Sequence, residues 1–105
     1  MISVILEFEP IAEMENEFIS SWKECTEVIY KNFGSLGSRL HRSDKGNFIA
    51  YAQWPSKDAY EKSSAWPEEL VLVRDRMRSL LKGGKPKVLH LLEVEVDLLK
   101  AEIHC

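Results

Sequence analysis

Histidines and aromatic residues are the side chains of this 105-residue chain whose types and spacing could do chemistry. The three histidines, His41, His90 and His104, form no i,i+4 pair and accompany no Cys-x-x-Cys motif, so we expect no metal site. His90 lies in an alternating segment with Val88 and Leu92, and strict alternation predicts that it faces the helices. A histidine in apolar surroundings is able to act as a base near neutral pH. We therefore predict His90 as a catalytic base, with a core histidine hydrogen-bonded to the backbone as the alternative.

Three tryptophans and three tyrosines supply aromatic side chains that suit a flat ligand. Trp54 closes the segment FIAYAQW, and Trp22, Tyr60 and Trp66 are candidates for lining the same space. We predict these four residues as substrate-binding walls of a pocket between a sheet and its helices. Core packing is the alternative, because buried aromatic residues chiefly pack.

Other polar and reactive residues suggest no site. Arg74, Arg76 and Arg78 follow one another along a helical segment, and we expect an exposed helix face for all three. Cys25 lies within a helical pattern and is expected to be a small core residue. Gly83-Gly84 follows a helix instead of opening one, so it does not indicate a phosphate-binding loop.

The composition is typical of one folded domain spanning residues 1–105, with 45% hydrophobic and 30% charged residues. A net charge of −3 without a long basic run argues against nucleic-acid binding. No apolar stretch reaches the ~18 residues of a membrane helix, and the segment MISVILEFEP lacks the basic region of a signal peptide. Two cysteines, Cys25 and Cys105, do not suggest a disulfide framework, so we expect a cytoplasmic protein.

Hydrophobic periodicity predicts the element order β-α-β-β-α-β. Alternation predicts strands over residues 2–8, 36–42, 48–54 and 87–98, and helical spacing predicts helices over 12–33, from Lys57 onward and over 68–82. The turn residues of 43–47 predict that the second and third strands pair as an antiparallel hairpin. This order indicates an α+β, ferredoxin-like fold with a four-stranded antiparallel sheet.

Helices cover one face of such a sheet, and the other face must be solvated or meet a partner. We expect that second face to carry a mixed set of side chains, namely Ile5, Glu7, Arg39, His41, Ile49, Tyr51, Gln53, Leu89, Leu91 and Glu93. A large exposed apolar patch usually marks an interaction site. We therefore favour a homodimer with Arg39, His41 and Tyr51 at its interface. The long last strand is consistent with reaching toward another subunit. A monomer with one wet sheet face, and a simple overhang of that strand, are the alternatives.

Three motifs follow one another in the middle of the chain: GSRLHRS (37–43), FIAYAQW (48–54) and SKDAY (56–60). With them, the stretch from Gly34 to Ser63 resembles the antibiotic biosynthesis monooxygenase (ABM) domain family. The resemblance implies a dimeric α+β barrel, in which two ferredoxin-like protomers press sheet against sheet. Some members of the family oxidise polycyclic aromatic substrates with molecular oxygen and without metal, flavin or haem, so the resemblance also implies that no cofactor is needed.

The chain departs from the family pattern at one position and from its haem-degrading relatives at others. Typical members place a histidine nine residues after the tryptophan, where this chain has Ser63. The haem-degrading relatives use an asparagine on the first strand, where this chain offers Glu7 and Glu9, and a histidine on the second helix, which has none after Trp66. We therefore predict a cofactor-independent monooxygenase acting on a small aromatic or quinol-like metabolite. The alternative is a non-catalytic homodimer of the same fold that binds a small molecule or regulates. A cavity of roughly 300 Å³ or more, lined by Trp54 and reached by His90, would favour ligand binding.

Overall fold

The computed structural model describes residues 1–99, so His104 and Cys105 lie outside the described residues. The order of elements is β1 (Ile2–Phe8), α1 (Glu15–Asn32), β2 (Gly37–Arg42), β3 (Phe48–Trp54), α2 (Lys57–Lys62), α3 (Glu68–Ser79), a 3₁₀ turn (Lys82–Gly84) and β4 (Lys87–Glu93). The predicted β-α-β-β-α-β order is confirmed, with the second helical segment divided into α2 and α3.

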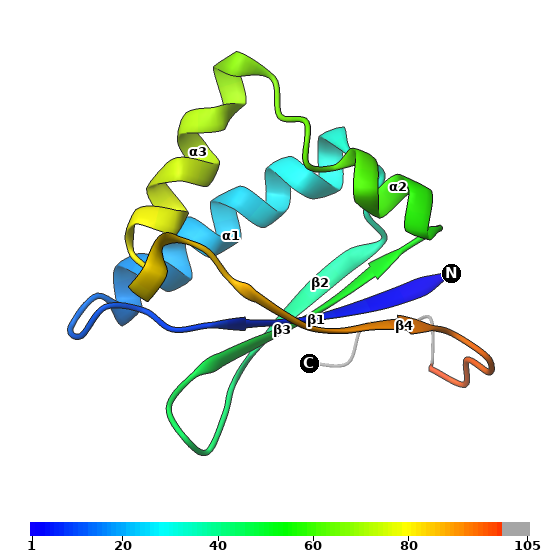
Figure 1. Cartoon of the computed structure of the whole chain (residues 1–105), viewed down its shortest axis with the longest axis horizontal. Helices are drawn as coiled ribbons and strands as arrows, with labels where there is room; N and C mark the ends of the chain where they lie inside the picture. The colour runs from blue at the N-terminus through cyan, green and yellow to red at the C-terminus, as the bar shows by residue number, and fades with distance from the viewer. Residues whose placement is uncertain (100–105) are drawn as a thin grey trace.

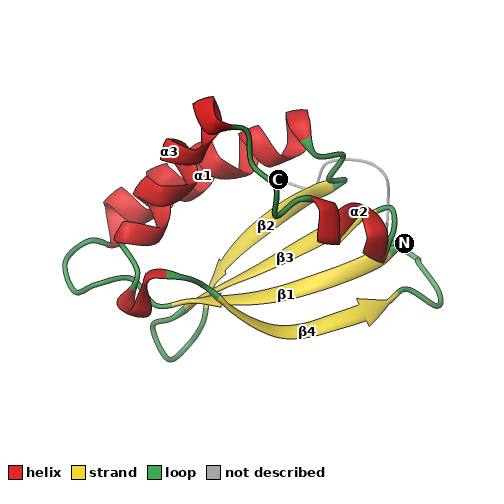
Figure 2. Ribbon diagram, turned by 45° about the horizontal axis from the view of Figure 1, so that its top comes forward, coloured by secondary structure: helices red, strands yellow, loops and turns green. Residues whose placement is uncertain are grey.

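The four strands form one antiparallel sheet in the order β2-β3-β1-β4, which is the ferredoxin-like arrangement. Helices α1 and α3 pack together over one face of this sheet, and α2 lies on the same side next to β3 (Figures 1 and 2). The opposite face carries no helix of the described chain. None of the helices described within residues 1–99 is long and apolar enough to cross a membrane.

Local sequence explains where these elements begin and pack. The alternating residues Val4 and Phe8 of β1 are buried beneath the helices, where the ring of Phe18 lies 5.3 Å from that of Phe8 and 5.2 Å from that of Phe48. Ser56 caps α2, since its Oγ accepts a hydrogen bond of 3.1 Å from the Ala59 N–H. Helix α1 therefore supplies the central aromatic side chain of the core, and the short α2 begins at a capped residue.

Strand β4 is shorter than predicted, because it ends at Glu93 and not near Leu98. Its one neighbour in the sheet is β1, which begins at Ile2, and Ile2 pairs with Glu93. After a last backbone hydrogen bond from Val94 N–H to the Met1 carbonyl, no strand remains for the chain to pair with. The alternation of residues 94–98 therefore does not produce a strand within the described chain.

A β-bulge between β1 and β4 changes which side chains of β4 face the helices. Leu6 pairs with Val88 and Ile5 pairs with His90, so Leu89 is an extra residue without a partner on β1. Val88 consequently lies on the helix side with Leu6, whereas His90 lies on the opposite face with Ile5. The prediction that His90 faces the helices is wrong, because strict alternation does not allow for the extra residue.

The helix-free face, called the outer face below, is defined by the strand registers. Arg39, Tyr51, Ile5 and His90 form one row across all four strands, and His41 lies in the next row beside Ile49. On β4, we expected Leu89, Leu91 and Glu93 on the outer face. Because of the bulge, the β4 residues on this face are instead Lys87, His90 and Leu92. The positions predicted on β1, β2 and β3 are those observed.

Candidate functional site

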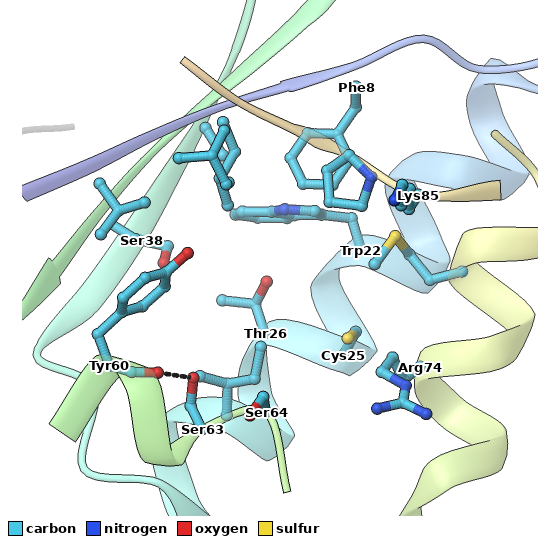
Figure 3. A pocket seen from close by; sticks show the side chains of 18 of the residues that line it. Phe8, Trp22, Cys25, Thr26, Ser38, Tyr60, Ser63, Ser64, Arg74 and Lys85 are labelled. Carbon is cyan, nitrogen blue, oxygen red and sulfur yellow. Dashed lines mark hydrogen bonds between the residues drawn. The ribbon is translucent and has the colours of Figure 1, made fainter. Parts of the chain in front are cut away.

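A cavity of about 450 Å³ lies between the helix-covered face of the sheet and the three helices (Figure 3). Val4, Leu6 and Phe8 of β1 form part of its sheet side, together with Ala50 and Ala52 of β3. The two alanines leave room beneath the helices because their side chains are small. The size exceeds the roughly 300 Å³ set above as the lower limit for a small-molecule site.

All four predicted aromatic wall residues line this cavity: Trp22, Trp54, Tyr60 and Trp66. Trp54, only 4% exposed, meets Tyr60 edge to face at a centroid distance of 5.7 Å. Trp66 packs against Phe33 with centroids 5.2 Å apart. The structure therefore brings together side chains from α1, β3, α2 and the segment before α3. Their role in binding a substrate stays a prediction.

Hydroxyl groups form the polar part of the lining. Thr26, Ser38, Tyr60, Ser63 and Ser64 all contribute, and Figure 3 shows the Thr26 and Tyr60 side chains facing the interior of the cavity. Ser63, at the position where the resemblance implies a histidine, uses its hydroxyl to donate a hydrogen bond to the Tyr60 carbonyl. Burial raises the pKa of the Tyr60 phenol. This phenol therefore keeps its proton at neutral pH and is a hydrogen-bond donor.

Cys25 also lines the cavity, but it is not a nucleophile at neutral pH. The side chain is 2% exposed, and burial raises the pKa of its thiol to about 11, although the charges of Arg78 and Arg74 act in the opposite direction. The thiolate is the reactive form of cysteine. The expected role of Cys25 as a small core residue agrees with its place in the main buried cluster.

Two arginines of α3 line the cavity, and sequence reasoning missed both. Arg74 and Arg78 are part of the lining, and the Nε atom of each is buried, so the expectation that they lie on an exposed helix face is wrong. Arg76 does lie on the exposed side, 3.5 Å from a carboxylate oxygen of Glu24. The sequence does contain a signal for this placement, because Arg74 and Arg78 follow the apolar residue Leu70 of the same helix by four and eight residues and so share its helix face.

The predicted base, His90, does not reach this cavity in the described chain. His90 is exposed on the outer face and is absent from the lining, whereas Glu61, at the end of α2, contributes a carboxylate to it. The side chain of Glu61 is 62% exposed, and its Oε1 lies 3.9 Å from Lys57 Nζ. The geometry thus offers a carboxylate at the rim of the cavity and no imidazole among the described lining residues.

Comparison with solved structures finds the same fold in several proteins. SnoaB, a cofactor-independent oxygenase from Streptomyces nogalater, is similar with a TM-score of 0.74 at 17% identity, over 94% of this chain and 97% of that chain. Rv0793 from Mycobacterium tuberculosis is similar with a TM-score of 0.72 at 16% identity, over 93% and 98% of the two chains. At such identities the likeness shows the fold alone. A search of the curated proteins found no match.

The family itself is shown by the sequence. The profile of the family described as antibiotic biosynthesis monooxygenase matches residues 1–68, which is more than half of the chain. The match extends from β1 to the beginning of α3 and so includes Trp22, Trp54, Tyr60 and Trp66. The chain belongs to the antibiotic biosynthesis monooxygenase family.

Proposed function

We propose that this protein is a cofactor-independent monooxygenase that oxidises a small aromatic or quinol-like metabolite in the cavity. The observation that carries the proposal is an aromatic-walled cavity of about 450 Å³ in a member of the ABM family. Ligand sites of proteins are clefts of ~300–1,000 Å³ lined mainly by apolar and aromatic side chains. A similar fold in SnoaB, a cofactor-independent oxygenase, supports the same class of reaction.

In such a reaction the substrate itself supplies the electrons. Loss of a phenolic or enolic proton makes an electron-rich carbanion, which reacts with O₂. A methylene group between aromatic rings becomes a carbonyl group, with one atom of O₂ retained in the product and the other released as water. The protein must hold a flat substrate, accept a proton and keep water from the intermediate.

The lining residues divide these tasks. Trp22, Trp54 and Trp66 provide flat apolar walls, and the protonated Tyr60 phenol is placed to donate a hydrogen bond to a substrate oxygen. Glu61 provides a carboxylate that can take the substrate proton. His90 lies on the outer face, so its position does not support the prediction that it is the base. Variants of His90 and Glu61 distinguish the two candidate bases.

Oxygen consumption with a panel of anthrones and quinols tests the proposal. We expect the wild type to exceed the protein-free rate with at least one substrate, and Tyr60→Phe and Glu61→Gln each to lower that rate about 10²-fold. Tyr30→Phe and Asp58→Asn are the matched controls, because both residues are exposed and lie outside the cavity lining.

The remaining outcomes of this experiment assign the base or reject the enzyme. Loss of activity in His90→Ala but not in Glu61→Gln would assign the base to His90. A wild type that stays at the protein-free rate with the whole panel would refute the oxygenase. In that case the alternative, a homodimer that binds a small molecule without reaction, is favoured by Ser63, which stands where the family has a histidine.

The assembly that we propose is a homodimer in which a second copy covers the outer face. Arg39, His41 and Tyr51 lie on this face beside apolar Ile5 and Ile49, and all five belong to rows of paired residues. The segment after β4 adds side chains that are largely exposed, namely Val96 at 76%, Leu98 at 90% and Leu99 at 70%. Apolar groups gathered on one side of a small protein are typical of an interface.

Light scattering tests this assembly. We expect a mass of twice the 12.1 kDa of the chain for the wild type and a mass near 12.1 kDa for Tyr51→Lys, which places a charge in the middle of the outer face. Leu72→Lys is the control, because Leu72 is 69% exposed on α3, away from the outer face. A wild type with the mass of a single chain would refute the dimer.

A further inference from the structure

The arginines of α3 are divided between solvent and the cavity. Arg76 points outward and pairs with Glu24 across the α1–α3 contact. Arg74 and Arg78, one helical turn apart, both line the cavity, and Figure 3 shows the Arg74 guanidinium on the α3 side, across from Tyr60. Two cations from one helix are thus presented to an aromatic-walled space.

The Nε atom of each inward arginine lacks a hydrogen-bond partner within the described protein. Arg74 Nε and Arg78 Nε are buried, and no group of residues 1–99 accepts a hydrogen bond from either atom. Asp75 Oδ1 lies 3.5 Å from Arg74 Nε, but it does not have hydrogen-bonding geometry. Within the same residues, Arg78 has no carboxylate within ion-pair distance. Buried donors of this kind are rare because an unmade hydrogen bond costs free energy.

The charges of the lining add to a positive potential. Lys85 joins the two arginines on this side, and Glu61 is the acidic residue among the described lining residues. Cys25 is neutral at pH 7, since the pKa of its thiol is about 11, and so it does not offset the arginines. Apolar walls lower the local dielectric constant and so strengthen the attraction between these cations and an anion.

We propose that Arg74 and Arg78 form an anion subsite that makes the cavity selective for flat aromatic molecules carrying a negatively charged oxygen. The inference rests on the proposed function in taking the cavity as the ligand site. A guanidinium presents parallel N–H donors that match two oxygens of a carboxylate, or one phenolate oxygen between two donors. Trp66, whose ring centroid lies 5.8 Å from Arg74 Cζ, places an aromatic wall directly beside the cation.

Calorimetric titration without oxygen tests this subsite apart from any reaction. The probes are naphthoate and the neutral naphthamide, which share one ring system and nearly one shape. We expect naphthoate to bind the wild type at least tenfold more tightly than naphthamide. Arg74→Met and Arg78→Met should each lower that preference about tenfold, whereas Arg76→Met should leave it unchanged.

Charge-retaining variants and a third probe complete the test. Arg74→Lys and Arg78→Lys should keep most of the preference, which separates the loss of charge from damage to the fold. Naphthol, titrated below and above its own ionisation, shows whether a phenolate is taken as well as a carboxylate. Equal affinity of the wild type for naphthoate and naphthamide, or a preference that survives in the Arg74→Met, Arg78→Met double variant, would overturn the subsite.

The two proposals can fail separately. Anion-selective binding in a protein that consumes no oxygen with any substrate would leave the subsite in place and reject the oxygenase. Oxygen consumption that is equal for neutral and anionic quinols, and unchanged in the two methionine variants, would reject the subsite and leave the oxygenase.

Discussion

The two faces of the same sheet differ in how the protein completes them. On the helix-covered face, Val4, Phe8 and Phe48 are buried by the chain's own helices, and the remaining space is a defined cavity. On the outer face, the row that contains Tyr51 and Ile5 is left with mixed polar and apolar side chains and no helix. The chain therefore completes the packing of one face with its own helices and leaves the other face to solvent or a partner.

The difference extends to hydrogen bonding. On the outer face the polar side chains hydrogen-bond to one another. The Tyr51 hydroxyl accepts one hydrogen bond from Gln53 Nε2 at 2.8 Å and another from Ser3 Oγ at 3.2 Å. On the helix-covered side, the buried Nε atoms of Arg74 and Arg78 find no acceptor within residues 1–99. Buried polar groups without a partner are rare in native proteins and call for an explanation, which is the reason for proposing that the cavity, and not the outer face, binds a ligand.

The largest expected effect comes from the core of the helix-covered side. Phe18→Ala should lower the free energy of unfolding by about 3–5 kcal/mol, because Phe18 is 0% exposed and packs between Phe8 and Phe48. Leu72→Ala, at a site 69% exposed on α3, should change it by about 0.5 kcal/mol or less. Urea unfolding gives both values. Similar costs for the two variants would show that the helix-covered face is not the main core.

The second effect is a pH dependence that arises at the buried thiol. Burial raises the pKa of Cys25 from 9.0 to about 11, so the unfolded chain loses this proton at lower pH than the folded one. The contribution of the protonated Cys25 thiol to the free energy of unfolding is fully present below pH 9.0. It is lost as pH rises toward 11, which lowers that free energy by roughly 3 kcal/mol. Cys25→Ala should remove this part of the decline. Urea unfolding of both proteins from pH 8 to 11 measures the difference, and parallel pH curves would contradict it.

The sequence was sufficient for most of the fold, because alternation and turn chemistry are local. The bounds of β1 and β3, the cap at Ser56 and the four aromatic cavity residues all follow from it. It was insufficient for β4. A bulge at Leu89 depends on pairing with β1, which no local pattern reveals, and one inserted residue moves every later side chain to the other face.

The sequence indicated the aromatic residues that line the cavity, but not the two arginines that line it. Arg74 and Arg78 occupy an apolar helix face, but a charged residue in that pattern is ordinarily taken for a solvated one. The long arginine side chain can place its stem in the core and its charge in a cavity. Only the packing of α1, α3 and the sheet creates the space that receives them.

The smallest expected effect concerns the least anchored wall of the cavity. Helix α2 has no buried residue, although it carries Tyr60 into the lining. Ser56→Ala should lower the free energy of unfolding by about 1 kcal/mol, because it removes the acceptor of the Ala59 N–H, and Ser56→Asp should restore it. Urea unfolding measures both.

A matched variant separates the cap from the packing of this wall. Tyr60→Ala removes the edge-to-face contact with Trp54 and leaves the cap in place. If the cap holds α2, Ser56→Ala should weaken ligand binding in the cavity even though Tyr60 itself is intact. If Ser56→Ala leaves both stability and binding unchanged while Tyr60→Ala lowers both, the wall is held by its contact with the sheet, and the helix-covered face is completed by packing alone.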